Sequence, residues 1–302
     1  MATDDDFEFV KFYSDGLRIS ARLWQPAGWS DGDATRPGIV SLHGYTGMTH
    51  IYGMDVPRRL AAEGYWVLAP DHRGFGRSEG QRGRMRPLEQ AQDTYDAVSF
   101  FSTIDGVDRE RLGVYGTSFG GANAIWAAAF DERIKVVVTS VGVTDGFEWM
   151  RTIRRPHEWY ELRDRIDQDA RRRTQAGEPQ WLPMREVMIS DPHTLGVWQN
   201  FNWDDDPYYV PEYDLESLEA ALRYRPVWVA PQIAPRPVMV IYAELDGLVP
   251  PEQAFSLYEA LGEPKKLVKL PGAHHYESYA FVSAAMHERG MAAAVAWFGQ
   301  YL

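Results

Sequence analysis

The amino-acid sequence predicts an α/β protein, with a mostly parallel central sheet flanked by helices and an inserted helical cap. Short β-branched runs alternate with stretches of helical spacing over most of the 302 residues, as in sheets whose crossovers are helices. The interval 146–232 breaks this rhythm, because it has no clear strand and is too long for a loop. We therefore expect a core domain of residues 1–145 and 233–302 and a cap of residues 146–232.

The individual elements follow from local patterns. Ser14-Asp15-Gly16 between the first two strands is a hairpin signal, so these strands are expected to be antiparallel and to form the edge of the sheet. Pro87 stands at a tolerated first position of a helix. The strands are predicted at residues 7–12, 17–24, 38–42, 65–69, 111–115, 135–140, 237–243 and 266–270. Helices are predicted at residues 53–63, 87–102, 118–130 and 278–301.

Composition excludes several classes of function. The net charge of −12 disfavours a nucleic-acid partner, and the basic run Arg171-Arg172-Arg173 is expected to form a solvated helix face with paired aspartates. The sequence has no cysteine, which excludes disulfides and thiol catalysis. No apolar run has the length of a membrane helix, and residues 1–6 lack the features of a secretory signal. We expect a cytoplasmic protein without a membrane or nucleic-acid partner.

A nucleophile elbow is predicted at Gly116-Thr117-Ser118-Phe119-Gly120. This run matches G-x-S-x-G and stands between a predicted strand and a predicted helix, which is the setting that the motif requires. The sharp turn forces Ser118 into a strained backbone conformation, and the small residues Gly116 and Gly120 relieve clashes. The helix N-terminus favours developing negative charge. Ser118 is therefore the predicted nucleophile.

A second tight turn, His43-Gly44-Tyr45-Thr46-Gly47, follows the strand that ends at Leu42. We expect its backbone N–H groups to face the carboxyl edge of the sheet. The N–H groups of Tyr45 and Phe119 are the predicted donors to a tetrahedral oxyanion. The side chain of His43 is expected to support the loop through its ring nitrogens and not to act as a base.

Two later loops supply the predicted acid and base. Asp246 lies just past a strand end and is preferred over Glu244, whose side chain should point to the other side. Of the two adjacent histidines, His275 is the predicted base and His274 the alternative. A metal site with Glu277 is not expected, since H-H-x-E lacks the spacing of H-E-x-x-H. The order serine, aspartate, histidine is the one expected for G-x-S-x-G hydrolases.

Together these motifs resemble the α/β-hydrolase superfamily over nearly the whole chain, and within it the esterase, dienelactone-hydrolase and acyl-peptidase-like branches. The run from Asp71 to Gly80 is similar to the family's D-x-R-G-x-G-x-S loop, in which Asp71 and Arg73 are expected to have a structural role. Ser118 excludes the members with an aspartate nucleophile, and HGYT argues against the HGGG lipase branch. The resemblance implies a serine hydrolase that cleaves an ester or related acyl bond without a cofactor or metal.

Several alternatives stay open at this point. The same triad serves amide, peptide or C–C bond hydrolysis, and a non-catalytic ligand-binding protein can have the same fold. Aromatic residues are dense in the cap and predict an apolar or aromatic small-molecule acyl substrate. Most of them are expected in the cap core, and the candidates for the substrate pocket are Trp159, Trp181 and Trp203. The aromatic insert also leaves a homodimer open.

Overall fold

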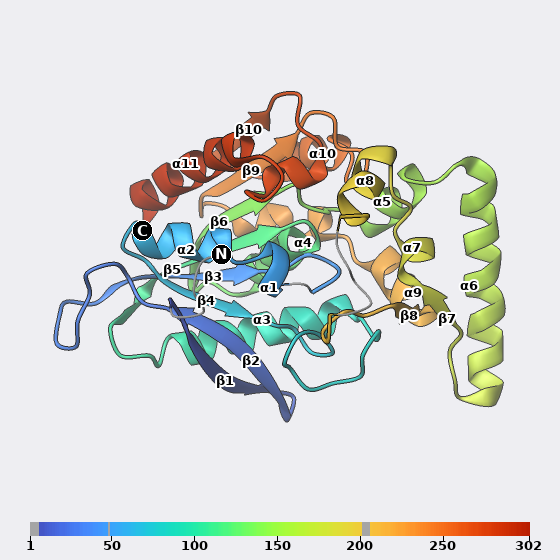
Figure 1. Ribbon diagram of the computed structural model, residues 1–302, viewed down its shortest axis with the longest axis horizontal. Coiled ribbons are helices and arrows are strands. Elements are labelled where there is room, and N and C mark those ends of the chain that lie inside the picture. Colours follow the sequence, from blue (N-terminus) through green and yellow to red (C-terminus); the bar gives the residue numbers. More distant parts are fainter. Residues whose placement is uncertain (1–5, 48, 201–205) are drawn as a thin grey trace.

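A computed structural model of the chain describes residues 6–47, 49–200 and 206–302. In these residues eight strands form one sheet in the order β1-β2-β4-β3-β5-β6-β9-β10 (Figure 1). The strands are β1 (Glu8–Ser14), β2 (Leu17–Trp24), β3 (Arg36–Leu42), β4 (Trp66–Pro70), β5 (Val107–Thr117), β6 (Ile134–Ser140), β9 (Val238–Ala243) and β10 (Lys265–Leu270).

The pairing of the strands confirms the predicted fold class. From β4 through β10 neighbouring strands are parallel, whereas β1 pairs with β2 and β2 with β4 in antiparallel register. The first two strands form one edge of the sheet, as the hairpin signal predicts. Asp15 and Gly16 both have positive φ, 48° and 80°, so the tight turn needs a glycine and a residue that tolerates this region. Strand β5 begins four residues before the predicted start at Arg111.

Helices cover both faces of the sheet. Helices α2 and α11 pack on one face, and α3, α4 and α10 pack on the other. Each face buries its own cluster of aliphatic and aromatic side chains. Because both faces are covered, the sequences of the central strands are almost entirely apolar. The helices of the core are α1 (Thr49–Tyr52), α2 (Asp55–Ala62), α3 (Pro87–Phe101), α4 (Phe119–Phe130), α10 (Glu252–Ala260), η4 (His275–Ser278) and α11 (Ala284–Tyr301).

The described residues of 146–223 are mainly helical and lie to the right of the sheet in Figure 1, whereas residues 226–233 contact core helix α4. The first of these ranges also contains two strands that the sequence pattern did not reveal, β7 (Trp181–Pro183) and β8 (Glu212–Asp214), which pair antiparallel. Three-residue strands are too short to show the alternation that identifies a strand. The helices of residues 146–233 are α5 (Gly146–Thr152), α6 (Pro156–Ala176), α7 (Met184–Val187), α8 (Pro192–Trp198), α9 (Leu215–Arg223), η2 (Pro226–Trp228) and η3 (Ala230–Ile233).

A third apolar cluster joins this cap to the loops at the end of the sheet. It combines Tyr45 and Phe119 of the core with Trp149, Tyr213 and Leu218 of the cap, all buried. The centroid of the Tyr45 ring lies 5.1 Å from that of Tyr213 and 5.4 Å from that of Phe119. The cap therefore packs directly on the two turns that the sequence assigns to the active site.

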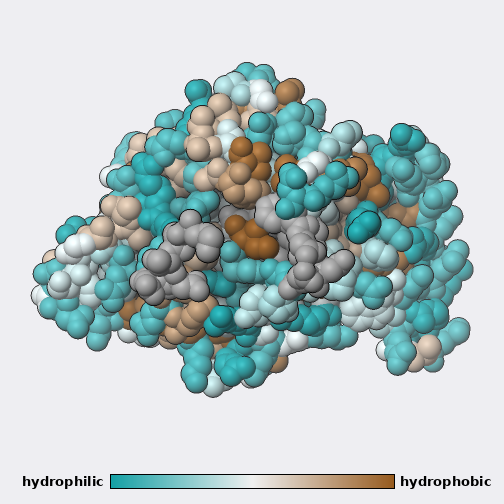
Figure 2. Space-filling view, in the orientation of Figure 1, coloured by the Kyte–Doolittle hydropathy of each residue, from teal (hydrophilic) through white to brown (hydrophobic). Residues whose placement is uncertain are grey.

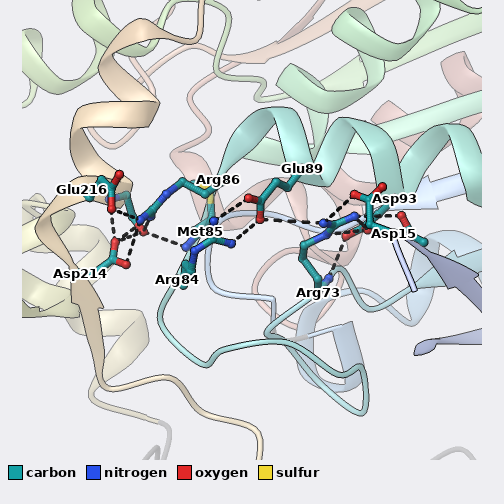
Figure 3. Close-up of polar contacts among 11 residues, drawn as sticks. Asp15, Arg73, Arg84, Met85, Arg86, Glu89, Asp93, Asp214 and Glu216 are labelled. Carbon is teal, nitrogen blue, oxygen red and sulfur yellow. Dashed lines mark hydrogen bonds and ion pairs between the residues drawn. The ribbon is translucent and has the colours of Figure 1, made fainter. Parts of the chain in front are cut away.

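Ion pairs fasten the cap to the loop that precedes α3 (Figure 3). Arg86 Nη1 donates to Asp214 Oδ1 at 2.8 Å, and Arg86 Nη2 donates to Glu216 Oε2 at 2.7 Å. Near the start of the same loop, Arg73 pairs with the buried Asp93 at 2.6 Å and with Asp15 at 2.9 Å. The side chain of Arg73 thus has the structural role that the sequence predicts.

The surface shown in Figure 2 is mostly hydrophilic, as the net charge of −12 leads one to expect. A small group of hydrophobic residues gathers near its centre, in the region where Figure 1 places α1. No helix in the described part of the chain combines the length and the apolar character needed to cross a membrane.

Candidate active site

Ser118 lies on a sharp turn between β5 and α4. Its φ of 55° and ψ of −122° are strained for a residue with a side chain. Hydrogen bonds on both sides hold this conformation, because the Ser118 N–H donates to Ser140 O at 2.9 Å and its carbonyl accepts from Gly121 and Val143. The turn has the geometry of a nucleophile elbow, which presents the serine hydroxyl at the end of the sheet.

The glycines of this turn are required by close backbone contacts. A Cβ at Gly116 would lie 2.2 Å from the carbonyl oxygen of Gly120, and a Cβ at Gly120 would lie 2.3 Å from that of Leu42. The first carbonyl belongs to helix α4 and the second to the end of strand β3, so neither can move without displacing that element. The clash relief predicted for Gly116 and Gly120 is therefore present.

Asp246 and His275 form a buried pair at the ends of β9 and β10. The His275 Nδ1–H donates to Asp246 Oδ2 at 2.7 Å, because an ionised carboxylate can only accept. The other oxygen, Oδ1, accepts from the N–H groups of Leu248 at 2.9 Å and Val249 at 2.7 Å. This network fixes the proton of the imidazole on Nδ1 and leaves Nε2 as the basic nitrogen.

The two alternative residues have other contacts. Glu244 is exposed, pairs with Lys269 at 2.8 Å and accepts from the N–H of Gly272. These contacts hold the pKa of Glu244 below its usual value. His274 stacks on His193 of the cap, with ring centroids 4.1 Å apart. The geometry therefore favours Asp246 and His275 over their neighbours.

Ser118 and His275 line the same cavity, which has a volume of about 40 Å³. No hydrogen bond joins the Ser118 hydroxyl to the imidazole in the part of the chain described, and such contacts often tighten only when substrate binds. Apolar and aromatic side chains form much of the wall. These are Leu42, Tyr45, Val56, Met188, Leu248, Tyr276 and Tyr279. Met188 comes from the cap, so the cap supplies part of the cavity.

The predicted oxyanion donors lie beside the serine. Phe119 is the first residue of α4, so its N–H has no acceptor within the helix. A Cβ at Gly44 would lie 3.3 Å from Ser118 Cβ, which places the Gly44-Tyr45 backbone against the nucleophile. The Tyr45 ring is buried and packs on Phe119 and Trp149. Burial raises the pKa of the Tyr45 phenol, which stays neutral.

His43 supports its loop as the sequence predicts. Its Nδ1–H donates to Gly44 O at 2.8 Å, and its Nε2 accepts from the N–H of His72 at 3.0 Å. Burial, followed by the neighbouring His72, lowers the pKa of His43 to about 4. A neutral ring with both nitrogens engaged is a structural element and not a base.

Of the three tryptophans predicted to line the substrate pocket, the two among the described residues do not line this cavity. Trp159 packs edge-on against Phe147 in the cap core, and Trp181 lies in β7 against Gly83. Trp203 lies outside the described residues. The tyrosines that line the cavity are instead Tyr45, Tyr276 and Tyr279, and the last two closely follow His275 in the sequence. Their position in the loop of the predicted base is the signal that could have identified them.

Solved structures of similar shape show that the chain has the α/β-hydrolase fold. The chain belongs to the family described as X-Pro dipeptidyl-peptidase (S15 family), whose model matches residues 15–276.

Three similar proteins illustrate the range of relatives. An uncharacterised 31.7 kDa protein of Escherichia coli, encoded in the traX-finO intergenic region, is 26% identical over 96% of this chain and 97% of its own length. A thiohydrolase of Aspergillus aculeatus is 26% identical over 91% of this chain and 87% of its own length. The crystal structure of a hypothetical protein from Pseudomonas aeruginosa superimposes with a TM-score of 0.83, at 23% identity, over 100% of this chain and 96% of that one. The relatives as a group include hydrolases, esterases and acyltransferases.

Proposed function

We propose that this protein is a serine hydrolase that cleaves a carboxylic ester through an acyl-enzyme. Ser118 is the nucleophile, His275 the general base and Asp246 the residue that orients the imidazole. The observation that carries the proposal is the buried Asp246–His275 pair, 2.7 Å apart, beside a serine with a strained backbone in one cavity. Two backbone N–H groups that donate to Asp246 Oδ1 fix the orientation of the carboxylate.

The reaction has two halves. His275 Nε2 takes the proton of Ser118 as the hydroxyl oxygen attacks the acyl carbon, and the backbone N–H groups of Tyr45 and Phe119 bind the oxyanion. The imidazolium then protonates the leaving alcohol. In the second half His275 activates a water, which releases the carboxylic acid and restores Ser118. The apolar and aromatic wall of the cavity suits an apolar or aromatic acyl group.

Labelling by a fluorophosphonate tests the nucleophile. The wild-type protein should label at one serine, and Ser118→Ala should abolish labelling and lower ester turnover by about 10⁴–10⁶-fold. Ser256→Ala is the matched control, because Ser256 is exposed on α10 and far from the motif in sequence. A Ser118→Ala protein that hydrolyses esters like wild type, or a wild-type protein that does not label, would refute the proposal. Failure to label would favour a ligand-binding protein.

A substrate panel tests the ester assignment. Nitrophenyl esters, thioesters, aminoacyl-proline amides and β-diketones differ in the bond that the same triad would break. The description of the family favours the amide as the second candidate, and the thiohydrolase relative favours the thioester. We expect short and medium acyl esters to turn over. If all esters are inert while an amide is cleaved, the ester assignment fails and the triad stands.

A further inference from the structure

A second cluster of polar side chains lies where the cap meets the loop of His275. His193 belongs to cap helix α8, His274 directly precedes the 3₁₀ helix η4, and Glu277 lies within η4. One ligand atom from each side chain lies within 4.8 Å of the others. Among the described residues, this is the one group of three or more histidine and carboxylate side chains with such spacing.

The two histidines have unused nitrogens. Their rings are nearly parallel, with centroids 4.1 Å apart and planes 9° apart. The Nδ1 atoms of His193 and His274 are both buried, and neither has a hydrogen-bond partner in the described part of the chain. Burying such a group without a partner costs free energy. These nitrogens are therefore available to a ligand, and rotation of one ring out of the stack would let both reach the same ion.

Backbone hydrogen bonds hold two carboxylates close to the histidine pair. The backbone N–H of His274 donates to Glu277 Oε2 at 2.7 Å, and this bond holds the Glu277 carboxylate close to the His274 imidazole. The N–H of His193 donates to Asp191 Oδ1 at 2.9 Å, and Asp191 caps helix α8. A second carboxylate thus adds negative charge near the cluster.

We propose that His193, His274 and Glu277 bind a divalent transition-metal cation such as Zn²⁺. Two imidazole nitrogens and one carboxylate oxygen are a common set of zinc ligands, with water in the fourth position. Bonds of about 2.1 Å in a tetrahedral site place ligand atoms about 3.4 Å apart. The ligand atoms lie within 4.8 Å of one another, so the side chains must rotate until these distances shorten to about 3.4 Å. The sequence spacing of His274 and Glu277 alone does not predict this site, because the third ligand comes from the cap.

The position of the site gives it a consequence. A cation held by His193 and His274 would join cap helix α8 to the loop that carries His275, and α8 already contacts η4. Metal binding is therefore expected to stabilise the docked cap. This inference does not depend on the proposed ester hydrolysis, and its test measures binding and stability and not activity.

Calorimetric titration of the full-length, untagged, chelator-treated protein with ZnCl₂ tests the site. We expect one ion per chain, and a Tm that rises by about 4 °C at a free Zn²⁺ concentration 100 times the Kd. His193→Ala should weaken binding by about 100-fold or more and remove the rise in Tm. Glu277→Gln should weaken binding as well, since an amide is a poor ligand for zinc.

His157→Ala is the matched control, because His157 is exposed on cap helix α6 and outside the cluster. It should bind Zn²⁺ like wild type. The wild-type protein should also give the visible absorption of a four-coordinate site with Co²⁺. The proposal is overturned if wild-type protein does not bind Zn²⁺, or if His193→Ala binds it with unchanged affinity and stoichiometry. A loss of binding in His157→Ala equal to that in His193→Ala would also overturn it.

Discussion

Replacement of Asp246 by asparagine tests the orienting role of this carboxylate. Two backbone N–H groups, from Leu248 and Val249, point at Oδ1, so the amide oxygen of asparagine must take that place. The amide NH₂ then faces His275 Nδ1, which lies 2.7 Å from Oδ2 in the native protein. A donor in that place forces Nδ1 to accept, and the proton of the neutral imidazole moves to Nε2. The ring can then no longer take the proton of Ser118.

The expected loss is large in activity and small in stability. A wrong tautomer in such a triad lowers kcat by about 10⁴, or about 5.5 kcal/mol of barrier. The two backbone hydrogen bonds to the side chain at 246 persist, so the free energy of unfolding should fall by only about 1–3 kcal/mol. Hydrolysis of a nitrophenyl ester and urea unfolding at the same pH measure the two effects on one sample.

Glu244→Gln is the matched control, two residues away on the exposed side of the same turn. Its native partners are Lys269 and the N–H of Gly272, and its kcat should stay within about twofold of wild type. The reasoning is refuted if Asp246→Asn keeps more than a tenth of the wild-type kcat. It is also refuted if the two variants lose activity equally.

Three further predictions concern the surroundings of the site. Gly44→Ala should lower kcat/KM by about 10-fold or more without changing Tm, because its Cβ would lie 3.6 Å from Ser118 Oγ; an unchanged kcat/KM would contradict this. The pKa of His43 is about 4 in the folded protein and 6.5 in the unfolded chain, so the unfolded chain binds the proton more tightly. The free energy of unfolding should therefore be highest above pH 6.5 and should fall by up to about 3 kcal/mol as the pH is lowered towards 4. Urea unfolding should show this slope in wild type and a flatter one in His43→Asn. Met188→Ala should enlarge the cavity, shift the ratio of kcat/KM towards longer acyl esters and cost about 2–5 kcal/mol in unfolding free energy; an unchanged ratio would contradict it.

The core of the fold and the candidate site could be predicted because their signals are local. Strand, tight turn and helix follow one another around Ser118 within a few residues, and the glycines at 116 and 120 mark the close contacts. The carboxyl ends of β5, β9 and β10 meet at one edge because these strands are parallel. A residue just past each strand end, such as Asp246 or His275, is thereby brought near the serine without any long-range pattern.

The cap could not be predicted in the same way, because its side chains are placed by contacts between distant segments. Trp159 and Trp181 are aromatic residues of the type that lines substrate pockets. Trp159 nevertheless packs on Phe147 in the cap core, and Trp181 lies against Gly83. The tryptophan content shows that an apolar interior exists. It carries no information on which rings line the cavity.

The pair of His193 and His274 shows why substrate and ligand specificity are harder to predict than the catalytic chemistry. The proposed catalytic residues follow parallel strands of one sheet, whereas these two rings meet only because helix α8 docks on η4 across 80 intervening residues. The residue spacing within either segment does not predict that contact. Moving the histidine by one position along α8 would turn its side chain away by about 100°. Met188 reaches the cavity by the same route. The cap residues that reach the cavity or the histidine pair are therefore those whose positions depend most on the tertiary structure.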